Sequence, residues 1–253
     1  MDGKRILILG GTSEATALAG RLTERRDWRV TISLAGRTRN PAPVPGDVRI
    51  GGFGGAEALA DYLRMEAIDA LVDATHPFAA NISANAAIAG RLTGTARIHL
   101  VRPPWSAQPG DDWREVADVD AAAACLSKIP SSNNNTVFLT VGRRELASFA
   151  RMAGQRFLIR SIERPDELED FTNAEWLFGR GPFSLKDERQ LMGQHDVGCL
   201  VAKNAGGPAT RAKLDAAGEL KIPVVMISRP PPPDGVNLDT VERIEGWLRA
   251  QLD

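Results

Sequence analysis

The sequence predicts an α/β protein built from two parallel-sheet units of similar size, with a cleft between them. Short aliphatic runs alternate with amphipathic stretches almost from end to end, and strands that are apolar on both faces are typical of parallel sheets covered by helices. The alternation is interrupted at residues 102–112, where prolines give way to polar turn formers. Glycine turns follow several of the aliphatic runs, as in dinucleotide-binding folds. Both units are therefore expected to be Rossmann-like, with the cleft as the expected ligand site.

The first series of elements forms the first predicted domain, residues 1–104, to which we assign nucleotide binding. Strands are expected at residues 5–9, 29–33, 48–50, 70–73 and 97–100. Amphipathic periodicity predicts helices at residues 12–25, 56–65 and 79–92.

The second series forms the second predicted domain, residues 105–253, to which we assign substrate binding. Strands are expected at residues 137–141, 157–161, 176–178, 197–201 and 224–227. Helices are expected at residues 120–128, 144–150, 184–195, 208–217 and 238–251. Four consecutive prolines at residues 230–233 predict a stiff, extended connection before the last helix.

Composition excludes several classes of protein. The chain has 253 residues and a net charge of −1, from 31 Lys and Arg against 32 Asp and Glu. This balance gives no overall attraction to nucleic acid or to an anionic membrane, so local basic groups must hold any anionic ligand. No apolar run approaches the ~20 residues of a membrane span. Cys125 and Cys199 lie in apolar segments, which predicts buried free thiols and a cytoplasmic protein.

A glycine turn follows the first predicted strand. Gly10 and Gly11 let the backbone approach a ligand closely, and the helix that follows offers free amides and a partial positive charge to a phosphate. Thr12 or Ser13 can cap that helix or donate to a phosphate oxygen. The full G-x-G-x-x-G pattern is absent, so a simple glycine turn before a capped helix remains the alternative.

The tip of the second predicted strand has no carboxylate, which an NAD enzyme uses to hold the adenosine ribose. Ser33, Arg37, Thr38 and Arg39 lie there instead. Arginine together with hydroxyl groups suits a 2′-phosphate, so this region favours NADP over NAD. The alternative is that Arg37 and Arg39 are solvated loop charges.

A polar string follows the fourth predicted strand, where doubly wound folds bind their ligands. Thr75, His76, Pro77 and Phe78 are expected to line the cofactor or the substrate there, with Pro77 at the start of the next helix. His76 is either a catalytic acid or a residue with a hydrogen-bonding or packing role. The three histidines lack the spacing of paired ligands, so we expect no metal site.

Cations lie at three strand ends of the second half. Arg143, Arg160 and Lys203, with Asn204 beside Lys203, are expected to bind a ligand that carries several carboxylates or phosphates. Ordinary surface charge is the alternative for each of them. Lys203 has the most site-like surroundings, because Asn204 and two glycines follow it closely.

Several chemistries are excluded. The residue four positions after the one tyrosine, Tyr62, is Glu66, so the Tyr-x-x-x-Lys pair of short-chain dehydrogenases is absent. The chain also lacks the G-x-S-x-G elbow of serine hydrolases and the phosphate loop of P-loop NTPases. Hydride transfer remains, because there the cofactor carries the reactive atom.

Five segments resemble the precorrin-6A reductase family of cobalamin biosynthesis. They are LILGGTSE (residues 7–14), DATHPFA (73–79), VGR (141–143), AKN (202–204) and IPVVMISRP (222–230). The segment with His76 is the most specific. The segments span nearly the whole chain in the order expected for that family.

The resemblance implies an oxidoreductase that uses NADPH to reduce one ring double bond of precorrin-6A, giving precorrin-6B. Residues 10–13 would then hold the pyrophosphate, residues 75–78 would flank the nicotinamide, and the second-half cations would bind substrate carboxylates. His76, Lys203 or water would donate the proton. Three alternatives remain: the cobalt-bearing substrate of the anaerobic branch, another NADP reductase acting on a smaller acid, and a non-catalytic NADP sensor.

Overall fold

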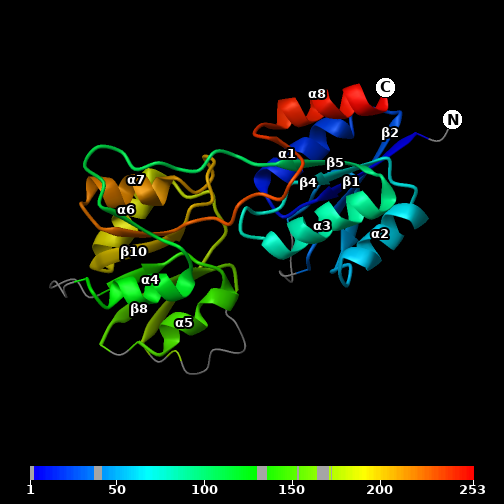
Figure 1. Cartoon of the computed structure of the whole chain (residues 1–253). Coiled ribbons are helices and arrows are strands. Elements are labelled where there is room, and N and C mark those ends of the chain that lie inside the picture. Colours follow the sequence, from blue (N-terminus) through cyan, green and yellow to red (C-terminus); the bar gives the residue numbers. More distant parts are fainter. Residues whose placement is uncertain (1–2, 37–41, 130–135, 153, 164–170, 172) are drawn as a thin grey trace. The chain divides into compact units, whose positions relative to one another are not determined.

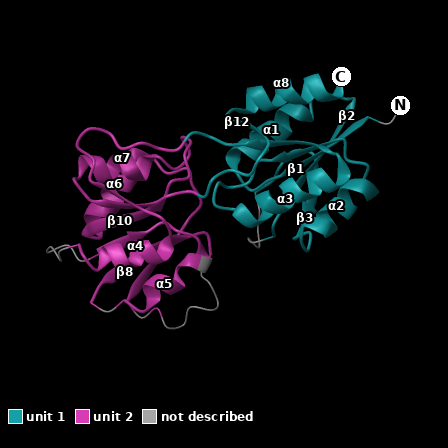
Figure 2. Ribbon diagram, viewed as in Figure 1, with its two compact units in different colours: residues 1–103, 230–253 teal, residues 104–229 magenta. Residues whose placement is uncertain are grey.

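The chain forms two compact units, shown in a computed structural model (Figures 1 and 2). The structure describes residues 3–36, 42–129, 136–152, 154–163, 171 and 173–253. Unit 1 comprises Met1–Pro103 together with Pro230–Asp253, and unit 2 comprises Pro104–Arg229. Unit 2 is therefore an insertion in the chain of unit 1.

Unit 1 contains a six-stranded parallel sheet in the order β12-β5-β4-β1-β2-β3. Its strands are β1 (Lys4–Leu9), β2 (Trp28–Leu34), β3 (Asp47–Ile50), β4 (Ala70–Asp73), β5 (Ala96–Leu100) and β12 (Val236–Leu238). Its helices are α1 (Ser13–Leu22), α2 (Ala56–Met65), α3 (Ala80–Thr93) and α8 (Val241–Leu252).

Helices cover both faces of this sheet (Figure 1). Ile6 and Ile8 pack in the core on the side of α1 and α8. Leu7 and Leu9 belong to the core on the side of α2 and α3. Successive strand residues thus enter opposite cores, which is why the strand is apolar throughout.

Unit 2 repeats this plan with a parallel sheet in the order β6-β11-β10-β7-β8-β9. Its strands are β6 (Trp113–Val116), β7 (Thr136–Leu139), β8 (Arg156–Ser161), β9 (Ala174–Phe178), β10 (Val197–Lys203) and β11 (Val224–Ile227). Its helices are α4 (Val119–Leu126), the 3₁₀ turn η1 (Arg143–Glu145), α5 (Ala147–Ala150), α6 (Leu185–Gln194) and α7 (Ala212–Glu219). Phe138, Leu200 and Met226 lie fully buried at the centre of one core.

Five neighbouring strands follow the same order in the two sheets, and in each sheet this strand order reverses at one point. The sixth strand differs, because β12 is the last strand of unit 1 along the chain whereas β6 is the first strand of unit 2. In unit 1 the order runs β1-β2-β3 to one side and β4-β5-β12 to the other. In unit 2 it runs β7-β8-β9 and β10-β11-β6. The crevice beyond the carboxyl ends of the central pair is where doubly wound folds bind ligands. These pairs are β1 with β4 and β7 with β10.

The predicted limits of the second domain were wrong at the C-terminus. Residues 230–253 belong to unit 1, because β12 pairs in parallel with β5 and because Ile244 and Leu248 of α8 are fully buried in the unit 1 core. The predicted helix at residues 238–251 accordingly begins only at Val241. The short edge strands β6 and β12 were not predicted, and the helix expected at residues 144–150 divides into η1 and α5.

Candidate functional site

The turn between β1 and α1 needs its two glycines for different reasons. The Gly10 amide donates to the Ser33 carbonyl oxygen at 2.9 Å, and a Cβ on Gly10 would lie 2.8 Å from the Ile32 side chain. Gly11 has a φ of +106°, which glycine adopts freely, and no atom lies within 4 Å of where its Cβ would stand. The backbone over Gly11 is therefore accessible to a ligand.

Thr12 ties this turn to the neighbouring strand. As the N-cap of α1, its Oγ1 accepts from the Ala15 amide at 3.1 Å and donates to the Ala74 carbonyl oxygen at 2.7 Å. The amides of Ser13 and Glu14, in the first turn, have no acceptor inside the helix. They supply N–H donors at the positive end of the helix dipole, as an anion site requires.

A carboxylate lies in the same first turn. Oε2 of Glu14 accepts from Nη1 of Arg102 at 2.6 Å and from the Ser13 hydroxyl at 3.0 Å. Burial raises the pKa of Glu14, but the hydrogen bond and charge of Arg102 outweigh it, and the net pKa is lowered. Glu14 is thus ionised at neutral pH, with Arg102 as its counter-charge.

Beside Ser33 lies a cation that sequence reasoning missed. Ser33 is 7% exposed near the end of β2 and is paired in register with Arg49 of β3. Nη1 of Arg49 lies 3.4 Å from the Ser33 hydroxyl oxygen, and the guanidinium donates to the carbonyl oxygens of Gly51 and Gly52 at 2.5 and 3.0 Å. The Arg49 Cζ also lies 3.7 Å from the centre of the Phe53 ring. A strand-end arginine before a glycine-rich segment was the available signal.

Thr75 lies in a polar turn just after β4. Both its amide and its hydroxyl donate to Oδ1 of Asp73, at 3.1 and 2.7 Å. His76 is exposed, and its Nδ1 accepts from the Phe78 amide at 3.3 Å. Pro77 does not open the helix as expected, because α3 begins at Ala80.

The sheet brings most of the predicted unit 1 residues to one edge. Leu9 is in register with both Ser33 and Asp73, so the turns after β1 and β4 and the end of β2 lie next to one another. That edge holds Gly10, Gly11, Thr12, Ser13, Ser33, Thr75, His76, Pro77 and Phe78. Arg37, Thr38 and Arg39 lie outside the described residues.

In unit 2, the carboxylate of Glu145 links the ends of the two central strands, β7 and β10. Lys203, the last residue of β10, forms an ion pair with Oε1 of Glu145. The Gly142 amide, in the turn after β7, donates to Oε2 of the same carboxylate. Arg143 begins η1 in this turn and is partly exposed. Lys203 and Arg143 thus lie on neighbouring turns, with Glu145 as a third charged group that the sequence reasoning did not assign.

Two other predicted substrate ligands are engaged within unit 2. Arg160 forms a two-pronged ion pair with Glu188 of α6, at 2.6 and 2.9 Å, and its guanidinium lies 4.0 Å from the centre of the Phe183 ring. The Asn204 side chain accepts from the Trp105 amide at 2.8 Å and donates to the Trp105 carbonyl oxygen at 2.9 Å. Both side chains therefore have a structural role that their position alone did not predict.

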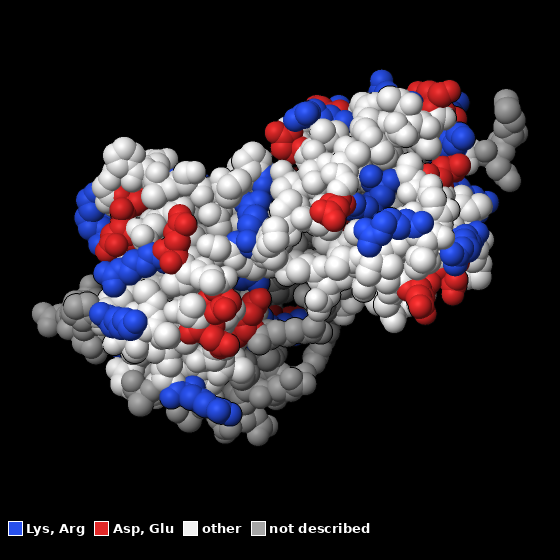
Figure 3. All heavy atoms as spheres, in the orientation of Figure 1, with Lys and Arg blue, Asp and Glu red and all other residues white. Residues whose placement is uncertain are grey.

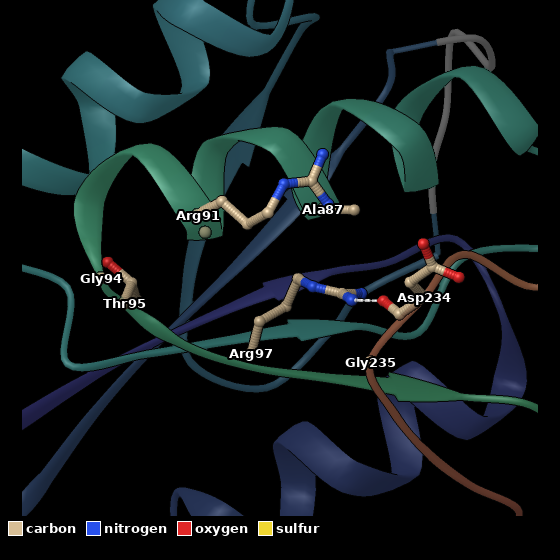
Figure 4. A pocket seen from close by; sticks show the side chains of 8 residues that line it. Ala87, Arg91, Gly94, Thr95, Arg97, Asp234 and Gly235 are labelled. Atoms are coloured by element: carbon tan, nitrogen blue, oxygen red, sulfur yellow. Dashed lines mark hydrogen bonds between the residues drawn. The ribbon is translucent and has the colours of Figure 1, made fainter.

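A hollow of about 340 Å³ in unit 1 lies elsewhere (Figure 4). Its lining includes Arg91 and Gly94 at the end of α3, Arg97 at the start of β5, and Asp234 and Gly235 before β12. It is therefore at the amino ends of these strands, away from the edge that carries the predicted nucleotide residues.

Charged side chains of both signs are intermixed on the face drawn in Figure 3, in keeping with the net charge of −1. Within the described residues, no group of three or more His, Cys, Asp or Glu is arranged to hold a metal ion. None of the helices there is both long and apolar enough to cross a membrane. Of the two thiols, Cys199 is buried whereas Cys125 is only partly so.

Comparison with known proteins identifies the family. The family model described as precorrin-6x reductase CbiJ/CobK matches residues 5–249. A precorrin-6A reductase of Rhodococcus erythropolis is 47% identical over 245 residues, covering 96% of this chain and 97% of that protein. A cobalt-precorrin-6A reductase of Priestia megaterium is 28% identical, covering 94% and 96%. A solved structure of CobK precorrin-6A reductase superimposes with a TM-score of 0.91 at 40% identity, covering 98% of this chain and 97% of that one. The chain therefore belongs to the precorrin-6x reductase CbiJ/CobK family.

Proposed function

We propose that this reductase uses NADPH to reduce one ring double bond of precorrin-6A, giving precorrin-6B in cobalamin biosynthesis. A hydride passes from the nicotinamide to one carbon of the double bond and a proton passes to its neighbour, leaving NADP⁺. The partners in this proposal are NADPH and a small tetrapyrrole, and the reaction takes place in the cytoplasm. Identity of 47% to the Rhodococcus precorrin-6A reductase, against 28% to the Priestia cobalt-precorrin-6A reductase, favours the metal-free substrate.

The observation that carries the choice of NADPH is the pairing of Ser33 with Arg49 at the tip of β2 and β3. A hydroxyl and a guanidinium suit a 2′-phosphate, whereas an NAD enzyme places a carboxylate in this region. In the proposal Arg37, Thr38 and Arg39 extend the same subsite. Among the described residues, Arg49 uses three of its five N–H groups on oxygen acceptors, so two remain for the phosphate.

The rest of the nucleotide follows the sheet edge. The open backbone over Gly11 and the first amides of α1 receive the pyrophosphate, with Ser13 beside them. Residues 75–78 flank the nicotinamide, which supplies the hydride when it is bound. The glycine turn fits this assignment, since no side-chain atom fills the space over Gly11.

Lys203 and Arg143 bind carboxylates of the substrate in the proposal. Their neighbouring turns carry two cations and the carboxylate of Glu145, and a substrate carboxylate that displaced Glu145 from Lys203 would exchange one ion pair for another. Arg160 and Asn204 contribute by holding the framework of unit 2. The proton comes from His76, from Lys203 or from water.

The decisive experiment measures loss of reduced-nicotinamide absorbance with purified protein and precorrin-6A. We expect oxidation that requires both protein and substrate and that is faster with NADPH than with NADH. Equal rates with the two nucleotides would remove the 2′-phosphate assignment. Oxidation only with the cobalt-bearing substrate would move the reaction to the anaerobic branch, and nucleotide binding without any oxidation would favour a sensor.

A further inference from the structure

The carboxylate of Asp73 is the most deeply buried charge at the nucleotide edge of unit 1. Asp73 is the last residue of β4 and is 0% exposed. Burying a carboxylate is costly unless hydrogen bonds compensate for the lost water. Oδ1 receives two such bonds, both from Thr75. The other oxygen, Oδ2, has no hydrogen-bond partner in the described part of the chain.

The side chain of His99, on the neighbouring strand β5, approaches that second oxygen. The register pairs Asp73 with His99, and His99 Nε2 lies 3.7 Å from Asp73 Oδ2. Burial lowers the pKa of His99, while the charge of Asp73 opposes this effect. The imidazole is therefore neutral at pH 7 and can donate only one N–H.

Holding Thr75 in place does not by itself require a charge, because an uncharged amide oxygen can accept from Thr75 as well. An ionised acceptor makes shorter and roughly twice as strong hydrogen bonds. Burying the charge is costly, but it strengthens the two hydrogen bonds from Thr75. The stronger bonds make the short turn that leads into residues 76–78 more rigid. Rigid geometry at that turn matters most if it sets the position of a reacting group.

We infer that Asp73 is a positioning residue that fixes the Thr75 turn against the nicotinamide end of the bound nucleotide. This inference rests on the proposed function, because it needs a dinucleotide at this edge. Asp73 acts through Thr75 and does not touch the reacting atoms. The consequence is that weakening the Asp73–Thr75 bonds leaves the adenosine end bound normally and loosens only the nicotinamide.

The test compares Asp73→Asn, Thr75→Val and Thr75→Ser with the wild-type protein. Thr75→Val removes the hydroxyl at nearly constant shape, and Thr75→Ser keeps it. Ser83→Ala is the matched control, since the Ser83 hydroxyl lies 3.4 Å from the same Thr75 oxygen but does not bond Asp73.

Binding is measured first, without substrate. NADPH is titrated by its nicotinamide fluorescence, and 2′,5′-ADP, which lacks nicotinamide, by calorimetry. We expect Thr75→Val to lose most of the fluorescence change and Asp73→Asn, whose amide oxygen still accepts from Thr75 but more weakly, to lose part of it, while the Kd of both for 2′,5′-ADP stays within about twofold. Thr75→Ser, which keeps the hydroxyl, should recover most of the fluorescence change that Thr75→Val loses, and Ser83→Ala should behave as wild type. An unchanged fluorescence response in Thr75→Val would overturn the inference, even if Asp73→Asn fails to fold.

Turnover gives the second readout. In Thr75→Val, kcat with precorrin-6A should fall roughly ten- to a hundredfold, and in Asp73→Asn it should fall by less, with KM for NADPH nearly unchanged in both. The isotope effect with 4-deuterated NADPH should rise, because hydride transfer becomes slower. A wild-type protein that binds NADPH but does not oxidise it would contradict the proposed function, and the fluorescence comparison would still decide the role of Asp73.

Discussion

The guanidinium of Arg49 is fixed by its neighbours on the protein. Its bonds to the Gly51 and Gly52 carbonyl oxygens and its contact with the Phe53 ring hold it beside Ser33. A cation held in this way loses little further conformational entropy when it meets a phosphate. At the residue scale this arrangement gives a specific prediction about nucleotide choice.

Arg49→Gln should raise the Kd for NADPH by about tenfold or more, in the range of a charge-assisted hydrogen bond. The Kd for NADH, which has no 2′-phosphate, should change much less. Fluorescence titration with both nucleotides measures this, with Arg64→Gln as control because Arg64 is exposed on α2 and paired with Asp61. An equal loss of affinity for the two nucleotides would show that Arg49 only supports the loop.

A variant at Arg102 should weaken the binding of NADPH and NADH alike, unlike Arg49→Gln, which should affect mainly NADPH. Its pairing with Glu14 cancels a negative charge in the first turn of α1. Arg102→Gln leaves that carboxylate unpaired, so NADPH and NADH should both bind several-fold more weakly through repulsion of the pyrophosphate. The double variant Arg102→Gln/Glu14→Gln should recover most of the affinity. A double variant as weak as the single one would exclude the electrostatic explanation.

Sequence reasoning predicted the position of residues that directly follow an apolar strand. Gly10, Gly11 and Thr75 follow apolar strands, and the parallel sheet brings their turns to one edge. It did not anticipate the partners of Arg160 and Asn204, because Glu188 and Trp105 are distant in the sequence. A strand-end cation looks the same in sequence whether it meets a ligand or a buried carboxylate.

At the scale of elements, two cations, Lys213 of α7 and Arg160 of β8, lie near a single carboxylate, that of Glu188 of α6. Lys213 of α7 is 9% exposed, and Arg160 and Glu188 already form an ion pair nearby. Burial lowers the pKa of Lys213 from 10.5 to about 8, with Glu188 opposing and Arg160 adding to the shift. The folded state therefore disfavours the charged lysine.

Lys213→Met should raise the free energy of unfolding at pH 7, by on the order of 1–3 kcal/mol. Between pH 8 and 10.5 the unfolded wild-type chain binds more protons at this site than the folded one, so wild-type stability rises with pH there. The advantage of Lys213→Met should shrink over the same range. Urea unfolding at pH 7, 9 and 10.5 measures both effects, and a pH-independent difference would contradict the assignment to Lys213.

The central strands were predicted, and so were the edge strands β3 and β9, but the edge strands β6 and β12 were not. Residues such as Ile6 and Leu71 are apolar because both faces of their strands are buried. β6 has the charged residues Arg114 and Glu115 at its centre, and β12 has three residues of which two are exposed, so these two strands carry neither an apolar run nor a clear alternation. The final helix was predicted to begin three residues too early, at Leu238, which is the last residue of β12.

At the scale of the whole molecule, the last 24 residues complete the unit that the first residues begin, from Pro230 to Asp253. Ile244 and Leu248 are both 0% exposed in the core of unit 1. Burying two aliphatic side chains of this size contributes about 3–6 kcal/mol, a large part of a typical domain stability of about 5–15 kcal/mol.

A chain truncated after Arg229 should therefore lose the fold of unit 1 and keep that of unit 2. Hydrogen exchange measures this by unit: amides of β4 and β5 should lose protection, whereas amides of β10 and β11 should keep it. A second chain tests unit 1 alone: residues 1–103 are joined to residues 230–253 by a glycine-serine linker that replaces unit 2. This chain should fold and bind NADPH. Protection of β5 in the truncated chain would show that β12 and α8 are dispensable.

The insertion of unit 2 into unit 1 also determines the order in which the two units can be completed during synthesis. Translation finishes unit 2 at Arg229, but the unit begun at the N-terminus must wait until α8 has left the ribosome. At about 5–20 residues per second, the interval between β5 and the last helix is roughly 8–30 s. Throughout that interval β5 has no partner on one side, and an unpaired strand edge is a template for association with other chains. The unit that is begun first is thus the unit whose sheet edge stays unpaired longest.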